Sequence, residues 1–211
     1  MIFKKCGGKC YDRATEYCEN ENICKEACSA GVISAVPAPV NGEVILPVGG
    51  TAALSVSGEK GDQLQWSKTS GTLTPSSDNK QATFTSADPG KVTVTFGSKT
   101  CSKCRTSIVV AFVKVTSFNT TPRAIKTGKS IKFTLTTNPA GAAYMKLVRV
   151  GVSKYSTFPP PDDLVQGINA SIEKGVWEYT FKEPCFFDLY ATAGGSNEIH
   201  YLDLITVDEP W

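Results

Sequence analysis

Cysteine is the residue type whose number and spacing most directly indicate chemistry in this sequence. The chain has eight cysteines among 211 residues, and five of them fall within the first 28 positions. They are Cys6, Cys10, Cys18, Cys24, Cys28, Cys101, Cys104 and Cys185. Cytosolic thiols are kept reduced, so this density favours a protein outside the reducing cytosol, held together by disulfides.

A zinc site is the alternative for the N-terminal cysteines. Cys6-x3-Cys10 and Cys24-x3-Cys28 are two close pairs whose spacing falls in the range of structural zinc ligands, because four thiolates satisfy a tetrahedral ion. Cys18 would then stay free. Four cysteines in all would be left unexplained, so we favour disulfides and keep zinc as the alternative cofactor.

The disulfide interpretation restricts which cysteines can pair. Five N-terminal cysteines are an odd number, so one of them must pair outside its segment, with Cys185 or with one of Cys101 and Cys104. Spacing alone does not give the connectivity. The segment has little apolar content and cannot bury enough surface to fold unaided, so its cysteines must hold it.

Cys101-Ser102-Lys103-Cys104 is a C-x-x-C motif. In a thioredoxin-type enzyme this motif opens a helix, and the helix terminus activates the thiol. Here it lies between two predicted strands. We therefore expect a structural bridge or a link to the N-terminal segment.

Other motifs that could suggest catalysis lack the neighbouring residues or secondary structure that the chemistry requires. The stretch 127–130 (TGKS) resembles the end of a phosphate-binding loop, but Arg123 stands where that loop needs glycine and a strand follows, which predicts a turn. His200 is the only histidine. The carboxylates considered for acid–base chemistry do not converge, and no enzyme is predicted. They are Asp162, Asp163, Asp188 and Asp203.

Aromatic residues suggest a second class of function. Tyr155 and Phe158, beside the prolines of 159–161, could form an exposed platform for a glycan. Trp177, Tyr179 and Phe181 alternate, and we expect them to point into a core instead. A glycan therefore remains an alternative partner, with Tyr155 and Phe158 as its contact residues.

Charge and hydropathy exclude several classes of partner. The formal net charge is +2 and charged residues make up 20% of the chain, without the basic stripe that nucleic-acid binding requires. No stretch is apolar enough to span a bilayer, and the first residues lack the apolar run of a signal peptide. We expect an extracellular or surface-exposed protein with no signal peptide in this chain and no membrane insertion.

Stepping along the chain from residue 43, short strands with a period of two alternate with turns. In 51–57, Ala52, Leu54 and Val56 share one face, and Trp66 lies in a later strand. Asp88-Pro89-Gly90 predicts a turn, since proline presets one torsion and glycine permits a positive one. The next strand, 91–96, carries Val92, Val94 and Phe96 on one side. This pattern predicts a β-sandwich.

The stretches VGGTAALSVSG, LQWS, ATFTSADPGKVTVTF and TSIVVAFVKV resemble the successive strands of a bacterial immunoglobulin-like domain. The strands beside Trp66 have no cysteine pair, so the inter-sheet disulfide of antibody domains is absent. The N-terminal GGKCYDRATEYCENENIC resembles short cysteine-rich modules beside such domains in bacterial surface proteins. The resemblance implies a fold and a spacer or adhesive context, and it transfers no functional residues.

The same pattern of short strands separated by turns repeats in the second half of the chain. Strands are expected there at 129–136, 144–152, 176–181, 186–192 and 200–207. An extended, proline-rich insertion is expected at 157–163. The predicted organisation is all-β: a cysteine-rich segment (1–35), an immunoglobulin-like domain (36–115) and a second one (116–211). The short join at 116–117 should fix the relative orientation of the two sandwiches.

The function predicted from the sequence is a non-catalytic structural or adhesive module of an extracellular, surface or phage-type assembly. Protein partners or self-assembly are expected, with strand addition at a free sheet edge as the mode. The alternatives are a carbohydrate-binding module and a zinc-stabilised interaction module.

Overall fold

The structure is a computed structural model of the chain. It describes residues 3–12, 14–25, 27–59, 63–121, 124–141, 144–152, 176–180, 185–194 and 200–208. Strands dominate throughout that part, and no helix found there has the length and apolarity to cross a membrane. The chain divides into two compact units, Met1–Ala111 and Phe112–Trp211.

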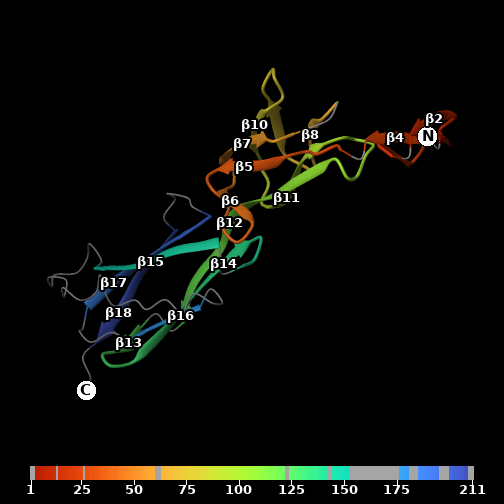
Figure 1. Ribbon diagram of the computed structural model, residues 1–211. Helices are drawn as coiled ribbons and strands as arrows, with labels where there is room; N and C mark the ends of the chain where they lie inside the picture. The colour runs from red at the N-terminus through yellow and green to blue at the C-terminus, as the bar shows by residue number, and fades with distance from the viewer. Residues whose placement is uncertain are drawn as a thin grey trace. The chain divides into compact units, whose positions relative to one another are not determined.

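Eight strands build the sandwich of the first unit, and most of them are labelled in Figure 1. They are β5 (Val32–Val36), β6 (Glu43–Pro47), β7 (Thr51–Ser57), β8 (Gln65–Lys68), β9 (Thr72–Pro75), β10 (Gln81–Thr85), β11 (Gly90–Gly97) and β12 (Arg105–Thr121), the last of which ends in the second unit. One sheet has the order β5-β7-β10-β9, and the other contains β12-β11-β8, with β6 paired to β12. Lettered in chain order, these are sheets A-B-E-D and G-F-C, the strand order of an immunoglobulin-like domain.

The core of this sandwich comes from strict alternation along the strands. In β7 every second residue is buried, which puts Ala52, Leu54 and Val56 inside. Phe84 of β10 is fully buried. The facing sheet contributes Trp66, whose ring centroid lies 4.9 Å from that of Phe96. Burying one such large apolar side chain is worth about 1.5–3 kcal/mol, so the two inner faces hold the sandwich together.

One asparagine links the two sheets at the end of the core. The indole Nε1 of Trp66 donates to the backbone oxygen of Asn79, at 2.9 Å, and Nδ2 of Asn79 donates to the oxygen of Leu64, at 2.7 Å. Asn79 has a positive φ of 60°, a conformation that asparagine tolerates better than most residues. The turn before β10 is thereby fixed to the strand that carries Trp66, and the buried indole donor is satisfied.

The second unit repeats the arrangement. Its strands after β12 are β13 (Ala124–Lys126), β14 (Ser130–Asn138), β15 (Met145–Val152), β16 (Val176–Thr180), β17 (Cys185–Ala193) and β18 (His200–Asp208). In this unit β12 pairs β14, which pairs β16, and the other sheet has the order β13-β18-β17-β15. These are sheets A-B-E and A′-G-F-C. No strand D is found between β15 and β16 in the part of the chain that is described.

The all-β, immunoglobulin-like fold predicted from the sequence is confirmed, and several strand bounds match closely. The prediction missed β9 and β13. It also placed 32–35 in the cysteine-rich segment, whereas β5 pairs β7 from Val32 to Val36 as strand A of the sandwich. At the expected join, 116–117, the strand β12 continues, with a register shift between Val115 and Ser117. The division into 1–35, 36–115 and 116–211 remains a prediction.

Some expectations fall on residues that the structure does not describe. The proline-rich insertion at 157–163 lies outside the described residues, as do the side chains of Trp177 and Tyr179. At the TGKS stretch, the amide of Lys129 donates to the oxygen of Lys126, at 3.1 Å, and β14 follows. The prediction of a turn at that motif is confirmed.

Candidate functional site

The N-terminal segment consists of two hairpins with two-residue loops. They are β1 (Phe3–Cys6) with β2 (Lys9–Asp12), and β3 (Glu16–Glu19) with β4 (Asn22–Lys25). Both loops, Gly7-Gly8 and Asn20-Glu21, have a positive φ at each residue. This backbone matches the right-handed twist of the flanking strands.

Gly7 is needed for a second reason. A Cβ at this position would lie 2.4 Å from the backbone oxygen of Glu21, in the loop of the other hairpin. The two loops are therefore in close approach. A disulfide between Cys6 and Cys18, with Cα atoms 5.6 Å apart, joins the two hairpins.

Two further disulfides attach the second hairpin, and the stretch that directly follows it, to the loop between β11 and β12. Cys24 pairs with Cys101 and Cys28 pairs with Cys104, across separations of 77 and 76 residues. In the chain-entropy model, a disulfide that closes a loop of this length stabilises the folded state by about 4.5 kcal/mol. The second bridge adds less, because the first has already brought the same two segments together.

The loop that receives these bridges is shaped by its own hydrogen bonds. The amides of Thr100 and Cys101 donate to Oγ of Ser98, at 3.3 and 3.2 Å. Nε of Arg105 donates to the backbone oxygen of Ser98, at 2.7 Å. At Gly97 a Cβ would lie 2.1 Å from the oxygen of Cys104. The loop therefore presents both cysteines in a defined position.

Polar contacts accompany the two bridges. The amide of Ser102 donates to Oε2 of Glu19, at 2.7 Å. This hydrogen bond from the Ser102 backbone is the main reason why the pKa of the Glu19 carboxyl is lowered from its ordinary value, because it favours the ionised form. The ammonium group of Lys103 lies 4.3 Å from the ring centroid of Tyr17, a cation–π contact.

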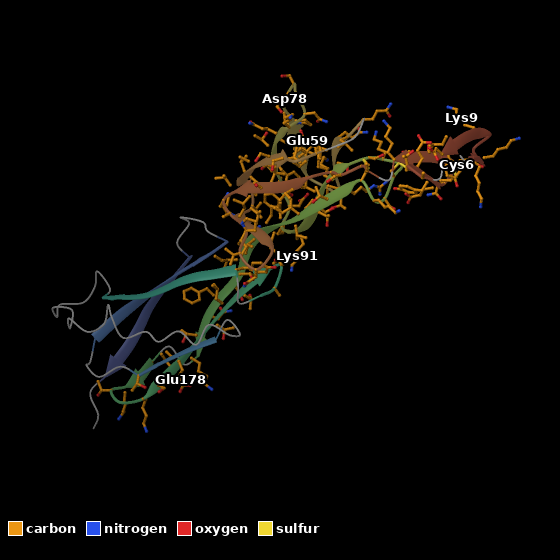
Figure 2. All side chains as sticks on the ribbon, viewed as in Figure 1. Cys6, Lys9, Glu59, Asp78, Lys91 and Glu178 are labelled. Atoms are coloured by element: carbon orange, nitrogen blue, oxygen red, sulfur yellow. A yellow bond between two sulfur atoms is a disulfide. The ribbon has the colours of Figure 1, made fainter. Side chains whose placement is uncertain are left out.

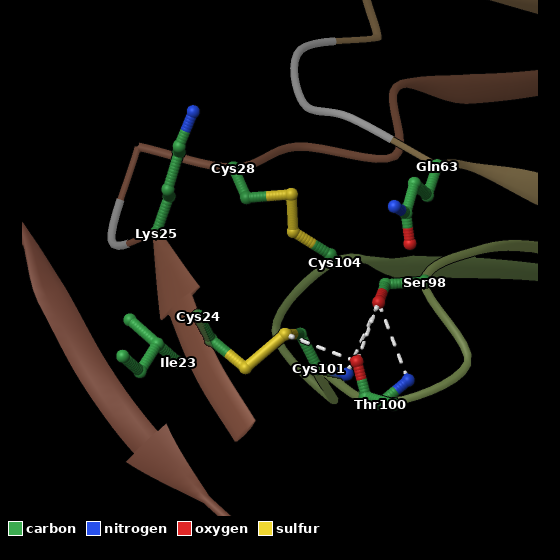
Figure 3. Close-up of a pocket in the computed structure, with 9 residues that line it drawn as sticks. All are labelled: Ile23, Cys24, Lys25, Cys28, Gln63, Ser98, Thr100, Cys101 and Cys104. Atoms are coloured by element: carbon green, nitrogen blue, oxygen red, sulfur yellow. Dashed lines mark hydrogen bonds between the residues drawn. A yellow bond between two sulfur atoms is a disulfide. The ribbon is translucent and has the colours of Figure 1, made fainter. Parts of the chain in front are cut away.

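A pocket lies where the hairpin meets the loop, and both disulfides line it (Figure 3). Its volume is about 220 Å³. The lining residues combine sulfur with a few polar side chains: Ile23, Cys24, Lys25, Cys28, Gln63, Ser98, Thr100, Cys101 and Cys104. Cys24, Cys101 and Cys104 are buried, and Tyr17, Cys28 and Leu64 pack against them. We refer to this contact between the β3–β4 hairpin and the 98–104 loop as the cysteine clamp.

The structure brings together six of the eight cysteines singled out from the sequence. The side chains of Cys10 and Cys185 lie outside the described residues, so a fourth bridge stays a prediction. The sequence predicted that one N-terminal cysteine pairs outside its segment, whereas two do so, Cys24 with Cys101 and Cys28 with Cys104. Both cysteines of the C-x-x-C motif pair with cysteines near the N-terminus. Of the two alternatives expected from the sequence, a local structural bridge and a link to the N-terminal segment, the structure shows the link.

The remaining candidates from the sequence are the zinc ligands, the glycan contacts and the acid–base residues. Three of the four proposed zinc ligands, Cys6, Cys24 and Cys28, lie in disulfides here, where their sulfur atoms are not thiolates. No group of three metal-ligating side chains occurs among the described residues. The proposed glycan contacts, Tyr155 and Phe158, lie outside the described residues, as do Asp162 and Asp163. The side chains of His200, Asp188 and Asp203 are likewise not described.

Reasoning from the sequence missed one surface. The outward face of the sheet β5-β7-β10-β9 carries only uncharged side chains on these four described strands. They are Val32, Ser34, Val36, Thr51, Ala53, Ser55, Ser57, Thr72, Thr74, Gln81, Thr83 and Thr85. Charged residues of this unit lie elsewhere, for example Glu59 after β7, Asp78 in a turn and Lys91 on β11 (Figure 2). The alternation of side chains in 32–36 was the signal in the sequence that could have identified β5 and its exposed face.

Comparison with known proteins gives a fold likeness only. No protein-family model matches the chain, and no curated protein matches it in sequence. The C-terminal 282-residue fragment of intimin, solved in complex with the intimin-binding domain of the translocated intimin receptor, is 15% identical, with a TM-score of 0.43 over 83% of this chain. This chain spans 63% of that fragment.

Two further solved structures are similar at the same level. The Escherichia coli adhesin FdeC is 14% identical, with a TM-score of 0.44 over 95% of this chain and 70% of that one. The Yersinia pseudotuberculosis adhesin InvE is 16% identical, with a TM-score of 0.32 over 84% of this chain and 58% of that one.

Proposed function

We propose that this chain is a non-catalytic adhesive or structural module that binds a protein partner, or a second copy of itself, through strand β5 and the uncharged sheet face beside it. The proposed setting is an extracellular, surface or phage-type assembly. The disulfides support a setting outside the reducing cytosol, because they persist there.

The observation that carries the proposal is the composition of an edge strand. β5 is the terminal strand of its sheet in the described part of the chain. Val32 and Val36 on it are 66% and 71% exposed, and the strand contains no charged residue. Edge strands usually carry charges, proline or bulges that block pairing with another chain. β5 lacks a charge where a solvent-exposed edge would be expected to have one.

The opposite edge of the same sheet shows the usual protection. β9 has only four residues and ends at Pro75, which has no amide hydrogen to donate. β5 has one residue more than β9, and its proline, Pro37, comes only after the strand has ended. Because every residue within β5 has an amide hydrogen, we expect strand addition at this edge, with backbone hydrogen bonds supplying affinity. The neutral serine, threonine and valine face would pack on a similar neutral face without charge repulsion.

The test uses the full chain with its disulfides intact. We expect self-association in sedimentation velocity between micromolar and millimolar concentration, or cross-linking to a component of the native envelope or particle from a photoreactive residue at position 34. Val32→Lys with Val36→Lys should weaken the interaction at least tenfold, since two charges on the edge oppose pairing. Ser67→Lys, on the outer face of the other sheet, should leave it unchanged.

Two outcomes contradict the proposal. One is a protein that remains monomeric at millimolar concentration and forms no cross-link to native material. The other is an interaction that the β5 double variant and the Ser67 control weaken equally, because binding would then not depend on this edge.

A further inference from the structure

Four cysteines of the clamp lie in a single cluster rather than in two separate bridges. Cys24, Cys101 and Cys104 are buried together at 1%, 8% and 1% exposure, and Cys28 packs against them. The two disulfides lie beside each other on one pocket (Figure 3). The two bridges therefore belong to one buried cluster.

The loop already holds Cys101 and Cys104 in a geometry that suits a different pairing. The amide of Cys104 donates to the backbone oxygen of Cys101, at 3.1 Å, which closes a four-residue turn. The ends of such a turn lie within about 7 Å of each other, and disulfides typically need Cα atoms about 4.4–6.8 Å apart. A Cys101–Cys104 bridge is thus within reach while β11 and β12 keep their places.

The four cysteine residues differ in exposure. Cys28 is half-buried, whereas the other three are buried. We therefore expect a thiol in solution to attack the disulfide at Cys28, because attack depends on access to the sulfur that is struck. The leaving group in that attack is the thiolate of Cys104.

We propose that these four cysteines form a thiol–disulfide exchange site, in which a dithiol reductant acts at Cys28 and the released Cys104 opens the second bridge. The dithiol's first sulfur bonds to Cys28 and expels Cys104 as a thiolate. Its second thiol then closes the dithiol into a cyclic disulfide and frees Cys28. The Cys104 thiolate attacks Cys101, forms Cys101–Cys104 and expels Cys24, which takes up a proton.

The consequence is that one two-electron reduction opens both connections. The dithiol is oxidised to its disulfide, Cys24 and Cys28 become thiols, and the loop keeps one internal bridge. Simple stepwise reduction would instead need two dithiols to free the hairpin. The C-x-x-C turn gives the N-terminal segment a single-step release.

The direct test is a thiol map of the full-length protein during limited reduction. The oxidised chain is treated with substoichiometric dithiothreitol, acid-quenched, labelled with N-ethylmaleimide and mapped by peptide mass spectrometry. We expect a species labelled at Cys24 and Cys28 that retains a Cys101–Cys104 bridge. Cys6 and Cys18 are followed on their own peptides and do not affect this assignment.

Two maps would overturn the proposal. In one, Cys28 and Cys104 are labelled while Cys24–Cys101 persists. In the other, all four cysteines become labelled together and a bridged C-x-x-C never accumulates. The first map would show that the released Cys104 does not open the second bridge, and the second map would show that this bridge opens by direct reduction.

A matched variant gives an independent rate. Cys28→Ser with Cys104→Ser leaves Cys24–Cys101 as the one bridge of the clamp and removes the exchange route. Release of the segment by dithiothreitol, followed by limited proteolysis, should be at least tenfold slower than in the unsubstituted chain. Equal rates would contradict the proposal, and the thiol map of the unsubstituted chain decides the matter if this variant does not fold.

Discussion

The cysteine-rich segment and the first sandwich are both made of short antiparallel strands, yet they are held by different forces. In the sandwich, β7, β10 and β11 bury every second side chain. Among the described side chains of the four strands β1–β4, the buried hydrophobic residues are two cysteines, Cys6 and Cys24. The sandwich rests on apolar packing, and the segment rests on sulfur–sulfur bonds.

The difference shows how little surface a short hairpin can bury. Isolated two-stranded hairpins are marginal in water, because they gain too little burial to offset their conformational entropy. The segment solves this by closing one bridge within itself and two bridges to the 98–104 loop. We therefore expect the position of the segment on the sandwich to depend on the redox state and the sandwich itself to be insensitive to it.

The largest expected effect comes from a truncation in the packed region. Phe84 is fully buried between the two sheets of the first unit. Phe84→Ala should lower the free energy of unfolding by about 3–5 kcal/mol, because it removes a large apolar side chain and leaves a cavity. Urea unfolding with the disulfides intact measures this change.

The neighbouring residue supplies the control. Thr83 lies on the same strand with its side chain on the exposed face, and Thr83→Ala should change stability by no more than about 0.5 kcal/mol. A Phe84→Ala protein that unfolds at nearly the same urea concentration as the unsubstituted chain would break the comparison, since packing would not be what holds the sandwich.

A smaller effect is expected from the polar contact in the clamp. Because the pKa of Glu19 is lowered in the folded protein, its contribution to docking is present above the ordinary value of 4.5 and is lost as the pH falls through the lowered value. The Ser102 amide resonance should titrate with a midpoint below 4.5 in an NMR pH series.

Glu19→Gln should abolish this titration of the Ser102 amide, and Glu21→Gln, which removes the same charge from the loop of the same hairpin, should not. A midpoint at or above 4.5 would argue that Ser102 does not donate to the carboxylate in solution. The hairpin should stay attached in both variants, since the bridges and not the carboxylate hold it.

Much of the sandwich could be predicted because its signal is local. The alternation of Ala52, Leu54 and Val56 fixes which face of β7 is buried, and the turn at Asp88-Pro89-Gly90 ends with a positive φ of 147° at Gly90. β9 was missed because Thr72-Leu73-Thr74-Pro75 contains a single large apolar residue, which is too little to define a period.

The clamp could be predicted only in part because its contacts are distant in sequence. Because the N-terminal segment has an odd number of cysteines, the sequence predicted that one of them pairs outside the segment. Nothing in the sequence around Cys24 identifies Cys101, 77 residues away, as its disulfide partner. The contact between Glu19 and Ser102 joins residues 83 positions apart. Such pairings follow from where the fold places the 98–104 loop, and a single sequence does not contain that information.

The central claim is that covalent bonds hold the segment while packing holds the sandwich. Hydrogen exchange with mass spectrometry on the oxidised chain, and on the chain after full reduction and alkylation, tests it directly. We predict that amides of β3 and β4 lose their protection on reduction, while those of β7, β10 and β11 keep theirs. The account would be contradicted if β3 and β4 stay protected, or if the sandwich strands lose protection along with them.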